Sequence, residues 1–216
     1  MVLHRKANII ITGTPGTGKS SHAQLLHEQL PELELVNILE VAKENNCITG
    51  YDEARKSQIV DEDRVVDALE DRIESGGLVI DWHVCDAFPE SQIDLVVVLR
   101  ASTDKVYDRL KERGYADDKI QENLDAEIME IVLNDAREQY DEDAIVELES
   151  NEASDVQSNV DRIVAWYNDW RDTNPRGVPT IQLPQSDSSD SSDDDNLVPA
   201  LKEKAAREKA EAEAKK

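Results

Sequence analysis

The sequence predicts an α/β fold in which helices cover both faces of a parallel sheet. Apolar runs of strand length alternate with segments of helical periodicity from residue 7 to about residue 172, which is the pattern of a parallel sheet. Most runs are rich in Val, Ile and Leu without strict alternation, as in strands that are buried on both faces. A glycine-rich stretch ending in a lysine and two serines follows the first run, and such a stretch holds phosphate.

Five segments are predicted strands because they are short and continuously apolar. They lie at residues 7–12, 33–36, 77–81, 93–99 and 144–148. The segments between them carry apolar stripes with the spacing of an α-helix. In 61–75 the stripe is Val65, Leu69 and Ile73; in 118–140 it is Ile120, Leu124, Ile128 and Ile131; in 152–170 it is Val156, Val160, Ile163, Tyr167 and Trp170.

The alternating pattern ends after Trp170. A proline-punctuated linker, an acidic Ser/Asp tract of low complexity and a charged segment of high helix propensity follow, at residues 174–185, 186–195 and 200–216. The acidic tract has the composition of a disordered chain, and the last segment has no apolar stripe with which to pack. We therefore predict one folded domain, residues 1–172, followed by a disordered tail, residues 173–216.

The chain is strongly acidic, with 48 acidic and 24 basic residues, and residues 1–186 alone contain 39 and 18. Such a surface repels a nucleic-acid backbone and attracts basic proteins, although the charge also serves solubility. The two cysteines, Cys47 and Cys85, have no paired spacing, so no disulfide framework or zinc site is expected. No apolar run has the length of a membrane span, and we expect a soluble intracellular protein.

The glycine-rich stretch matches the phosphate loop G-x-x-x-x-G-K-[ST] through Gly13, Gly18, Lys19 and Ser20. It follows a buried strand and opens a helix, which is the context that the motif requires. The glycines let backbone N–H groups surround a phosphate, and the helix N-terminus adds its positive end. We expect Lys19 to contact the β- and γ-oxygens and the Ser20 hydroxyl to bind Mg²⁺.

Further candidate residues follow the third and fourth predicted strands. Asp81 ends the third strand, where a carboxylate helps to hold Mg²⁺, and His83 follows it as a residue that orients water or takes a proton; a purely structural histidine is the alternative. Arg109 and Arg113 lie one helical turn apart. Arg113 precedes a glycine and is typical of a mobile phosphate clamp, whereas Arg109 is expected to pair with a nearby acid.

Three classes of phosphate-loop protein compete for these motifs. A ring-forming ATPase of the AAA class pairs its loop with a strand that ends in Asp-Glu and has a helical lid domain, but this strand ends in Asp-Trp-His and the chain is short. A GTPase needs an Asn-Lys-x-Asp motif, which the sequence lacks. A small nucleotide kinase fits better, since it needs only a second nucleotide site after the second strand and a short lid near the arginines.

The chain resembles the adenylate kinase isoenzyme 6 family, also described as coilin-interacting nuclear ATPases, whose fungal members are small-subunit ribosome assembly factors. The resemblance covers residues 7 to 172 and rests on "TGTPGTGKSS", "GYDEARKSQIVDEDRVVD", "IDWHVCDAFPE", "LVVVLR", "ERGY" and "ENLDAEI". It implies an adenylate-kinase-type fold with a five-stranded parallel sheet and a short lid. It also implies Mg²⁺-dependent ATP hydrolysis and AMP phosphorylation in the nucleus and cytoplasm, with binding to a small-subunit ribosomal protein.

Residue by residue, the resemblance implies a set of ATP contacts in the loop and the lid. These are Gly13, Gly16, Thr17, Gly18, Lys19, Ser20, Ser21 and Arg113. Asp81 and His83 match the Asp-x-His of the family, in the role of positioning Mg²⁺ and water. The monophosphate region is expected at residues 37–60, with Asn37, Lys43 and Arg55 as AMP-site candidates, and the lid at residues 112–122.

The departures from ordinary adenylate kinases point to weak phosphoryl transfer. The helix after the second strand offers only Lys43 where an arginine normally holds the AMP phosphate, and the helix after the lid has no arginine before Arg137. Fewer cations stabilise the transferring phosphoryl group less, and a short lid lets water compete. We expect a monomeric assembly ATPase with weak adenylate kinase activity, which binds a basic ribosomal protein in a pre-ribosomal particle and contacts RNA weakly or indirectly. The alternative is a housekeeping nucleoside-monophosphate kinase that balances adenylates.

Overall fold

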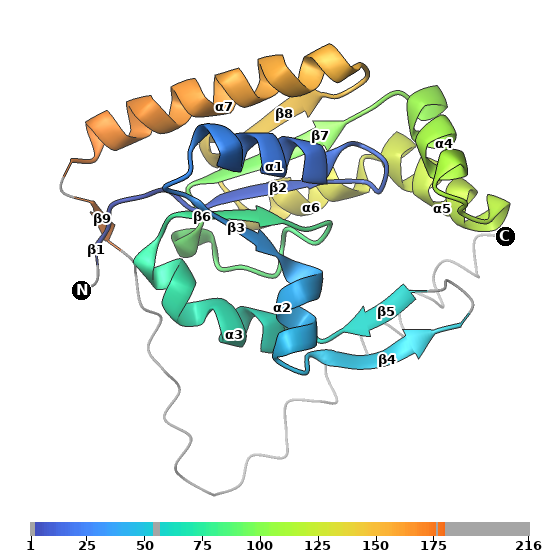
Figure 1. Ribbon diagram of the computed structural model, residues 1–216, viewed down its shortest axis with the longest axis horizontal. Coiled ribbons are helices and arrows are strands. Elements are labelled where there is room, and N and C mark those ends of the chain that lie inside the picture. The colour runs from blue at the N-terminus through green and yellow to red at the C-terminus, as the bar shows by residue number, and fades with distance from the viewer. Residues whose placement is uncertain (1–2, 54–56, 176, 180–216) are drawn as a thin grey trace, which may run out of the picture. The chain divides into compact units, whose positions relative to one another are not determined.

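The computed structural model describes residues 3–53, 57–175 and 177–179, and the structural statements below concern these residues. At its centre is a parallel sheet of five strands (Figure 1). In sheet order these are β3 (Glu34–Asn37), β6 (Leu78–Asp81), β2 (Ile9–Gly13), β7 (Leu95–Arg100) and β8 (Ile145–Glu149). The five predicted strands and their parallel arrangement are thereby confirmed, with bounds that shift by one or two residues.

Helices cover both faces of this sheet, as Figure 1 shows. On one face lie α1 (Lys19–Gln29) and α7 (Ala153–Thr173), and on the other lie α2 (Ile38–Glu44), α3 (Glu62–Ser75) and α6 (Ile131–Gln139). Successive side chains of a strand point to opposite faces. In β2, Ile9 and Ile11 therefore join the core beneath α1 and α7, whereas Ile10 joins the core beneath α3.

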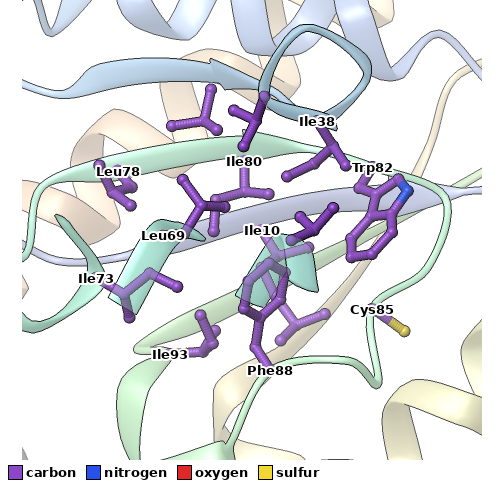
Figure 2. Close-up of a cluster of buried hydrophobic side chains, with 14 of the residues drawn as sticks. Ile10, Ile38, Leu69, Ile73, Leu78, Ile80, Trp82, Cys85, Phe88 and Ile93 are labelled. Atoms are coloured by element: carbon purple, nitrogen blue, oxygen red, sulfur yellow. The ribbon is translucent and has the colours of Figure 1, made fainter. Parts of the chain in front are cut away.

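Figure 2 shows the second of these cores, in which Ile10 and Ile80 from the sheet meet Leu69 and Ile73 from α3. Trp82 and Phe88 close it beyond the end of β6, with their rings edge to face at 5.8 Å between centroids. All six side chains are at most 4% exposed. Burial of an aliphatic or aromatic side chain of this size stabilises the fold by roughly 1.5–3 kcal/mol, so this core holds β2 and β6 together beneath the phosphate loop.

Two further helices, α4 (Thr103–Glu112) and α5 (Asp117–Ile128), follow β7. They form a small core of their own from Val106, Leu110 and Ile120, to which Ala101 is added from the end of β7. The turn between the two helices comprises residues 113–116. The residues predicted as a lid are thus this turn and the first half of α5.

The stripe predicted for residues 118–140 does not form one continuous helix face. The segment divides into α5 and α6 at Glu130, which has φ 57° and ψ 33°, the left-handed conformation that non-glycine residues seldom adopt. Ile120 is buried as expected, but Ile128 is 62% exposed and Ile131 is 41% exposed. The prediction that these two isoleucines pack inward is therefore wrong, because the break at Glu130 turns their side chains away from the core.

Some elements were not predicted at all. A hairpin of β4 (Ile48–Asp52) and β5 (Ser57–Val60) lies between α2 and α3, and β1 (Leu3–His4) pairs with β9 (Val178–Pro179). Two short 3₁₀ helices, Glu90–Gln92 and Glu142–Ala144, complete the fold. Helix α7 ends one residue beyond the predicted domain limit, and the tail from residue 180 onward lies outside the described residues. Within the described residues, no helix has the length and apolarity that spanning a membrane requires.

Candidate active site

The predicted phosphate loop leaves the carboxyl end of β2, in the middle of the sheet. In open parallel sheets, ligands bind at this edge. The strand register places Asp81 of β6 opposite Ile11 of β2 on one side and opposite Asn37 of β3 on the other. The sheet therefore brings the loop, Asp81 and Asn37 to one edge.

Two glycines shape the loop. A side chain at Gly13 would put its Cβ 2.5 Å from the carbonyl oxygen of Leu99, so strand β7 leaves no space for one. Gly18 is the N-cap of α1 in the left-handed conformation, with φ 96° and ψ 19°, which glycine adopts without strain. Helix α1 consequently begins at Lys19, and its unpaired N–H groups form a site that favours an anion.

Lys19 folds back over the loop. Its Nζ donates hydrogen bonds to the carbonyl oxygens of Gly13 at 2.7 Å and Thr14 at 3.2 Å. Burial lowers the pKa of Lys19 to about 8; Asp81 opposes this change and the nearby Arg113 adds to it. The ammonium group is thus held beside the loop by carbonyl oxygens alone and remains largely protonated at neutral pH.

Ser20 and Asp81 lie in direct contact. The Ser20 hydroxyl donates to Oδ2 of Asp81 at 2.6 Å. A hydroxyl and a carboxylate are hard oxygen ligands, and Mg²⁺ is usually held by one or two protein oxygens together with phosphate oxygens and water. The donor set at the end of β6 therefore fits a Mg²⁺ ion that arrives with a nucleotide. Within the described residues there is no cluster of three His, Cys, Asp or Glu side chains that could hold a metal by itself.

His83 lies two residues beyond the end of β6. Its ring is accessible to solvent, yet protein atoms surround much of it, and this burial lowers its pKa. The charge of Lys19 lowers the pKa further, and Asp81 raises it. A lowered pKa keeps the imidazole of His83 neutral at pH 7, the form that can accept a proton from water.

Arg113 is the C-cap of α4 and precedes Gly114, which has φ 73° and no atom within 4 Å of where its Cβ would lie. Its charge acts on Lys19. The described residues contain a cavity of about 310 Å³ beside the loop. It is lined by Gly16, Gly18, Ser21, Arg109, Glu112, Arg113, Ser150, Glu152, Ala153 and Val156. The predicted ATP contacts Gly16, Gly18, Ser21 and Arg113 therefore share one cavity, next to Lys19 and Ser20.

Arg109 does not pair with an acidic residue as we expected from the sequence. Its guanidinium donates to the carbonyl oxygens of Gly16 at 3.0 Å, Ser150 at 2.9 Å and Asn151 at 2.8 Å. It thereby ties the phosphate loop to the segment between β8 and α7. Sequence reasoning missed this role, because the acceptors are backbone atoms far away in the chain.

Glu127 is a buried carboxylate behind the loop that sequence reasoning also missed. It is 3% exposed. Its Oε2 accepts from the hydroxyl of Thr14 at 2.5 Å, and its Oε1 accepts from Nε of Arg100 at 2.7 Å and from the N–H of Ala101 at 3.1 Å. One side chain of α5 thus links the phosphate loop to the end of β7. In the sequence, only the position of Glu127 within the motif "ENLDAEI" pointed to a role for this residue.

The start of α1 has its own support. His22 is buried, and its Nδ1 lies 2.9 Å from the carbonyl oxygen of Gly18, while its Nε2 lies 3.2 Å from the side-chain nitrogen of Asn159. Burial lowers the pKa of His22, so the ring is neutral and donates to Gly18. Thr17 contributes inside the loop by donating its hydroxyl to the carbonyl of Thr14 at 2.9 Å.

The AMP-site candidates are less well supported. Asn37 caps α2 by accepting from the N–H groups of Leu39 at 3.0 Å and Glu40 at 3.4 Å, so its carbonyl oxygen already has a structural role. Lys43 is exposed in the last turn of α2. Arg55 lies outside the described residues.

Comparison with known proteins adds family information to this geometry. The family profile described as "AAA domain" matches residues 9–130. The chain is 52% identical to the adenylate kinase isoenzyme 6 homologue of Saccharomyces cerevisiae, over 86% of this chain and 95% of that protein. With the homologue of Schizosaccharomyces pombe the identity is 49%, over 76% and 93%. A gluconokinase structure from Sinorhizobium meliloti 1021 shares the fold at 16% identity and a TM-score of 0.52, over 79% of this chain and 98% of that one.

Proposed function

Since this chain belongs to the adenylate kinase isoenzyme 6 family and is a phosphate-loop protein of the nucleotide-kinase type, we propose that it is a Mg²⁺-dependent ATPase with weak adenylate kinase activity. In the kinase reaction, the γ-phosphoryl group of ATP passes to AMP and yields two ADP. We further propose that the protein uses ATP in the maturation of the small ribosomal subunit.

The observation that carries this proposal is the hydrogen bond between Ser20 and Asp81 at the end of β6, next to the phosphate loop over which Lys19 folds. Lys19 and Arg113 place positive charge where the transferring phosphoryl group develops negative charge. Ser20 and Asp81 are the residues that would hold Mg²⁺, which supplies further charge neutralisation at the phosphates when it is bound. We assign His83 the role of orienting a water molecule and accepting its proton during hydrolysis, since its lowered pKa keeps the imidazole neutral.

The cavity beside the loop is assigned to the adenosine part of ATP. Arg109 donates three hydrogen bonds through its N–H groups, which lie in the plane of the guanidinium, and it lines the cavity. Guanidinium groups stack on aromatic rings, so we propose that the adenine ring stacks on Arg109.

Phosphoryl transfer to AMP is expected to be weak, because the acceptor region offers little positive charge. Lys43 is the only cationic side chain among the described residues of the predicted monophosphate region, 37–53 and 57–60. A single exposed lysine holds a phosphate less firmly than the bidentate grip of an arginine. Water is then a competitive acceptor of the phosphoryl group.

The proposed partner is a basic small-subunit ribosomal protein in a pre-ribosomal particle. Residues 1–186 carry 39 acidic against 18 basic residues, which attracts a basic protein and disfavours direct contact with RNA. Such work requires the protein in both the nucleus and the cytoplasm. We expect ATP turnover to time the release of this partner.

A housekeeping nucleoside-monophosphate kinase is the second candidate. It is favoured by the names of the relatives, which are called adenylate kinase isoenzyme 6 homologues, and by a fold shared with a small-molecule kinase. Both candidates use the same donor site and differ in what accepts the phosphoryl group.

The test follows labelled ATP and resolves ADP from free phosphate, with and without AMP. Lys19→Ala serves as the inactive control. The proposal expects phosphate release that persists when AMP is present and that rises when a purified small-subunit ribosomal protein is added. Rapid and nearly complete diversion of the label into ADP by AMP, with no response to ribosomal proteins, would instead establish the housekeeping kinase.

A further inference from the structure

Three large apolar side chains that are neighbours in the sequence are exposed at the junction of α5 and α6. Ile128 is 62% exposed, Met129 is 65% exposed and Ile131 is 41% exposed. Single exposed apolar residues are common on protein surfaces, but contiguous apolar patches mark interaction sites. We refer to these three residues as the apolar knob.

The backbone holds the knob in a fixed shape. Glu130, between Met129 and Ile131, adopts the left-handed conformation, which is unfavourable for a residue with a side chain. Its carboxylate accepts from Nη1 of Arg100 at 3.1 Å, and Nη2 of Arg100 donates to the carbonyl of Glu127 at 3.0 Å. These contacts tie the strained turn to the end of β7.

An acidic track continues from the knob along α6. Ile131, Asp135 and Glu138 are four and three residues apart and therefore lie on one face of the helix. Burial raises the pKa of Asp135, and so do the charges of Asp86 and Glu138. Like charges thus crowd this face. Residues 117–143 as a whole contain 11 acidic and two basic residues.

We propose that the apolar knob and the acidic track form the docking surface for a basic segment of a protein partner, whose apolar side chains anchor on the knob while its Lys and Arg side chains pair with the track. This inference deepens the proposed binding of a basic protein and rests on it. Interfaces combine apolar anchors with charges that select and steer the partner. Here the apolar knob provides the anchors, and the acidic track provides the charges on an adjoining surface.

The knob is also connected to the nucleotide site. Ile128 follows Glu127, whose carboxylate accepts the hydroxyl of Thr14 in the phosphate loop. A partner that presses on the knob acts on the turn that also positions Glu127. The surface is therefore placed where partner binding and nucleotide binding can influence each other, which is what an ATP-timed release requires.

The experiment measures binding of purified, fluorescently labelled small-subunit ribosomal proteins, one at a time, by anisotropy. The full-length chain is compared with a knob variant, Ile128→Ser with Met129→Ser, and a track variant, Asp135→Asn with Glu138→Gln. Matched controls are Tyr107→Ser, which removes an apolar side chain that is 43% exposed on α4, and Glu70→Gln with Asp169→Asn, which removes two exposed charges on α3 and α7. Circular dichroism verifies that each variant is folded.

We expect the knob variant to raise the Kd of a bound ribosomal protein roughly tenfold or more, the loss typical of interface anchors. The track variant is expected to raise it severalfold at low salt and to flatten its salt dependence. The controls should leave Kd within about twofold. If the wild-type chain binds a ribosomal protein and the knob and track variants bind it equally well, the docking surface is wrong while the proposed partner class stands.

Other occupants of the knob would give different results. Concentration-dependent dimers in light scattering that the knob variant abolishes would identify a second copy of this chain. Tighter ribosomal-protein binding after truncation at residue 180, in the wild type but not in the knob variant, would identify the tail as a competing occupant and support the docking surface. A raised KM for AMP with unchanged partner binding would assign the knob to the acceptor site. A wild-type chain that binds none of the ribosomal proteins overturns both the docking surface and the partner proposal.

Discussion

The two sides of the candidate active site differ in how firmly they are held. The donor side comprises the phosphate loop and its supports, where Lys19, Arg109 and Glu127 each make two or more hydrogen bonds to elements around them. The acceptor side comprises residues 37–60, where β4 and β5 pair only with each other in the sheets of the structure. Leu39, Tyr51 and Ile59 of this side are about half exposed.

This difference shows which part of the candidate site holds its side chains in place before a ligand binds. A site gains catalytic power from groups that are already in place before the substrate binds, and the hydrogen-bonded groups of this site gather around the phosphate loop. A two-stranded hairpin is marginally stable by itself, so we expect the β4–β5 hairpin to be the least firmly held part of the acceptor side, whereas α2 is anchored in the core by Ile38 and Ala42. The contrast agrees with an enzyme that handles ATP well and AMP poorly, and the following predictions test it from the largest expected effect to the smallest.

Glu127→Ala should have the largest effect, because it removes the buried carboxylate that supports the donor side. Arg100 loses one of its partners, and the Thr14 hydroxyl and the Ala101 N–H lose their acceptor. We expect the free energy of unfolding to fall by roughly 2–4 kcal/mol, measured by urea denaturation. Glu127→Gln retains the shape and one acceptor oxygen, and it should lose less. Equal stability of Glu127→Ala and wild type would show that the donor side does not depend on this contact.

Arg109→Ala should weaken ATP binding without affecting AMP. The substitution leaves the carbonyls of Gly16, Ser150 and Asn151 without this donor and removes one wall of the cavity. We expect KM for ATP to rise roughly tenfold, since hydrogen bonds from a charged group are worth about 1.5–3 kcal/mol and water replaces part of them. Steady-state kinetics with each nucleotide varied in turn separates the two constants. A comparable increase in KM for AMP would contradict the division between the two sides.

The pH profile of ATP hydrolysis should report two donor-side groups. Burial lowers the pKa of His83 below its usual 6.5, so the neutral form persists at pH 7 and is lost only as pH falls through that lowered pKa. Lys19 has a pKa of about 8, so its charge is lost as pH rises above that value. We expect kcat/KM for ATP to fall severalfold on each side of a plateau near neutrality.

Two variants identify which residue causes the acid fall and which causes the alkaline fall of this profile. Lys19→Arg should remove the alkaline fall, whatever its absolute rate, because a guanidinium stays charged throughout. His83→Gln should remove the acid fall. A profile that is unchanged in both variants would mean that other groups control the reaction.

Lys43→Ala should have the smallest effect, because a single exposed lysine contributes little. We expect KM for AMP to rise about threefold and phosphate release without AMP to stay unchanged. The converse change, Lys43→Arg, should improve AMP phosphorylation, since arginine binds phosphate in a bidentate manner. A loss of more than tenfold in Lys43→Ala would show that the acceptor side is better organised than its structure indicates.

The sequence was sufficient for the sheet and for the position of the phosphate loop at the start of α1, because these depend on local patterns. Apolar runs identified all five central strands, and the loop motif located Lys19 and Ser20 beside Asp81. The sequence was insufficient where the role of a residue depends on partners that lie far away in the chain. Glutamate is usually exposed to solvent, but Glu127 is buried because its carboxylate accepts hydrogen bonds from Arg100 and Thr14, which are distant in the chain.

The division between α5 and α6 was equally invisible in the sequence. A periodic stripe through Ile128 and Ile131 predicts one helix face, and Glu130 carries none of the usual signals of a helix end, such as Gly or Pro. Tertiary contacts with Arg100 hold it in the left-handed conformation. Ile128 and Ile131, which the periodic stripe wrongly placed in the core, are therefore two of the three residues of the apolar knob.

The three acceptors of Arg109 have a consequence for protein engineering. All of them are main-chain carbonyls, which every amino acid possesses. The side chain at Ser150 can therefore be exchanged for another small residue without removing the oxygens that anchor the guanidinium, whereas Asn151 must be kept, because its side chain also accepts from the N–H of Ser102 at the start of α4. Under the proposed function, base selectivity can then be redesigned at other residues of this cavity while Arg109 itself stays fixed.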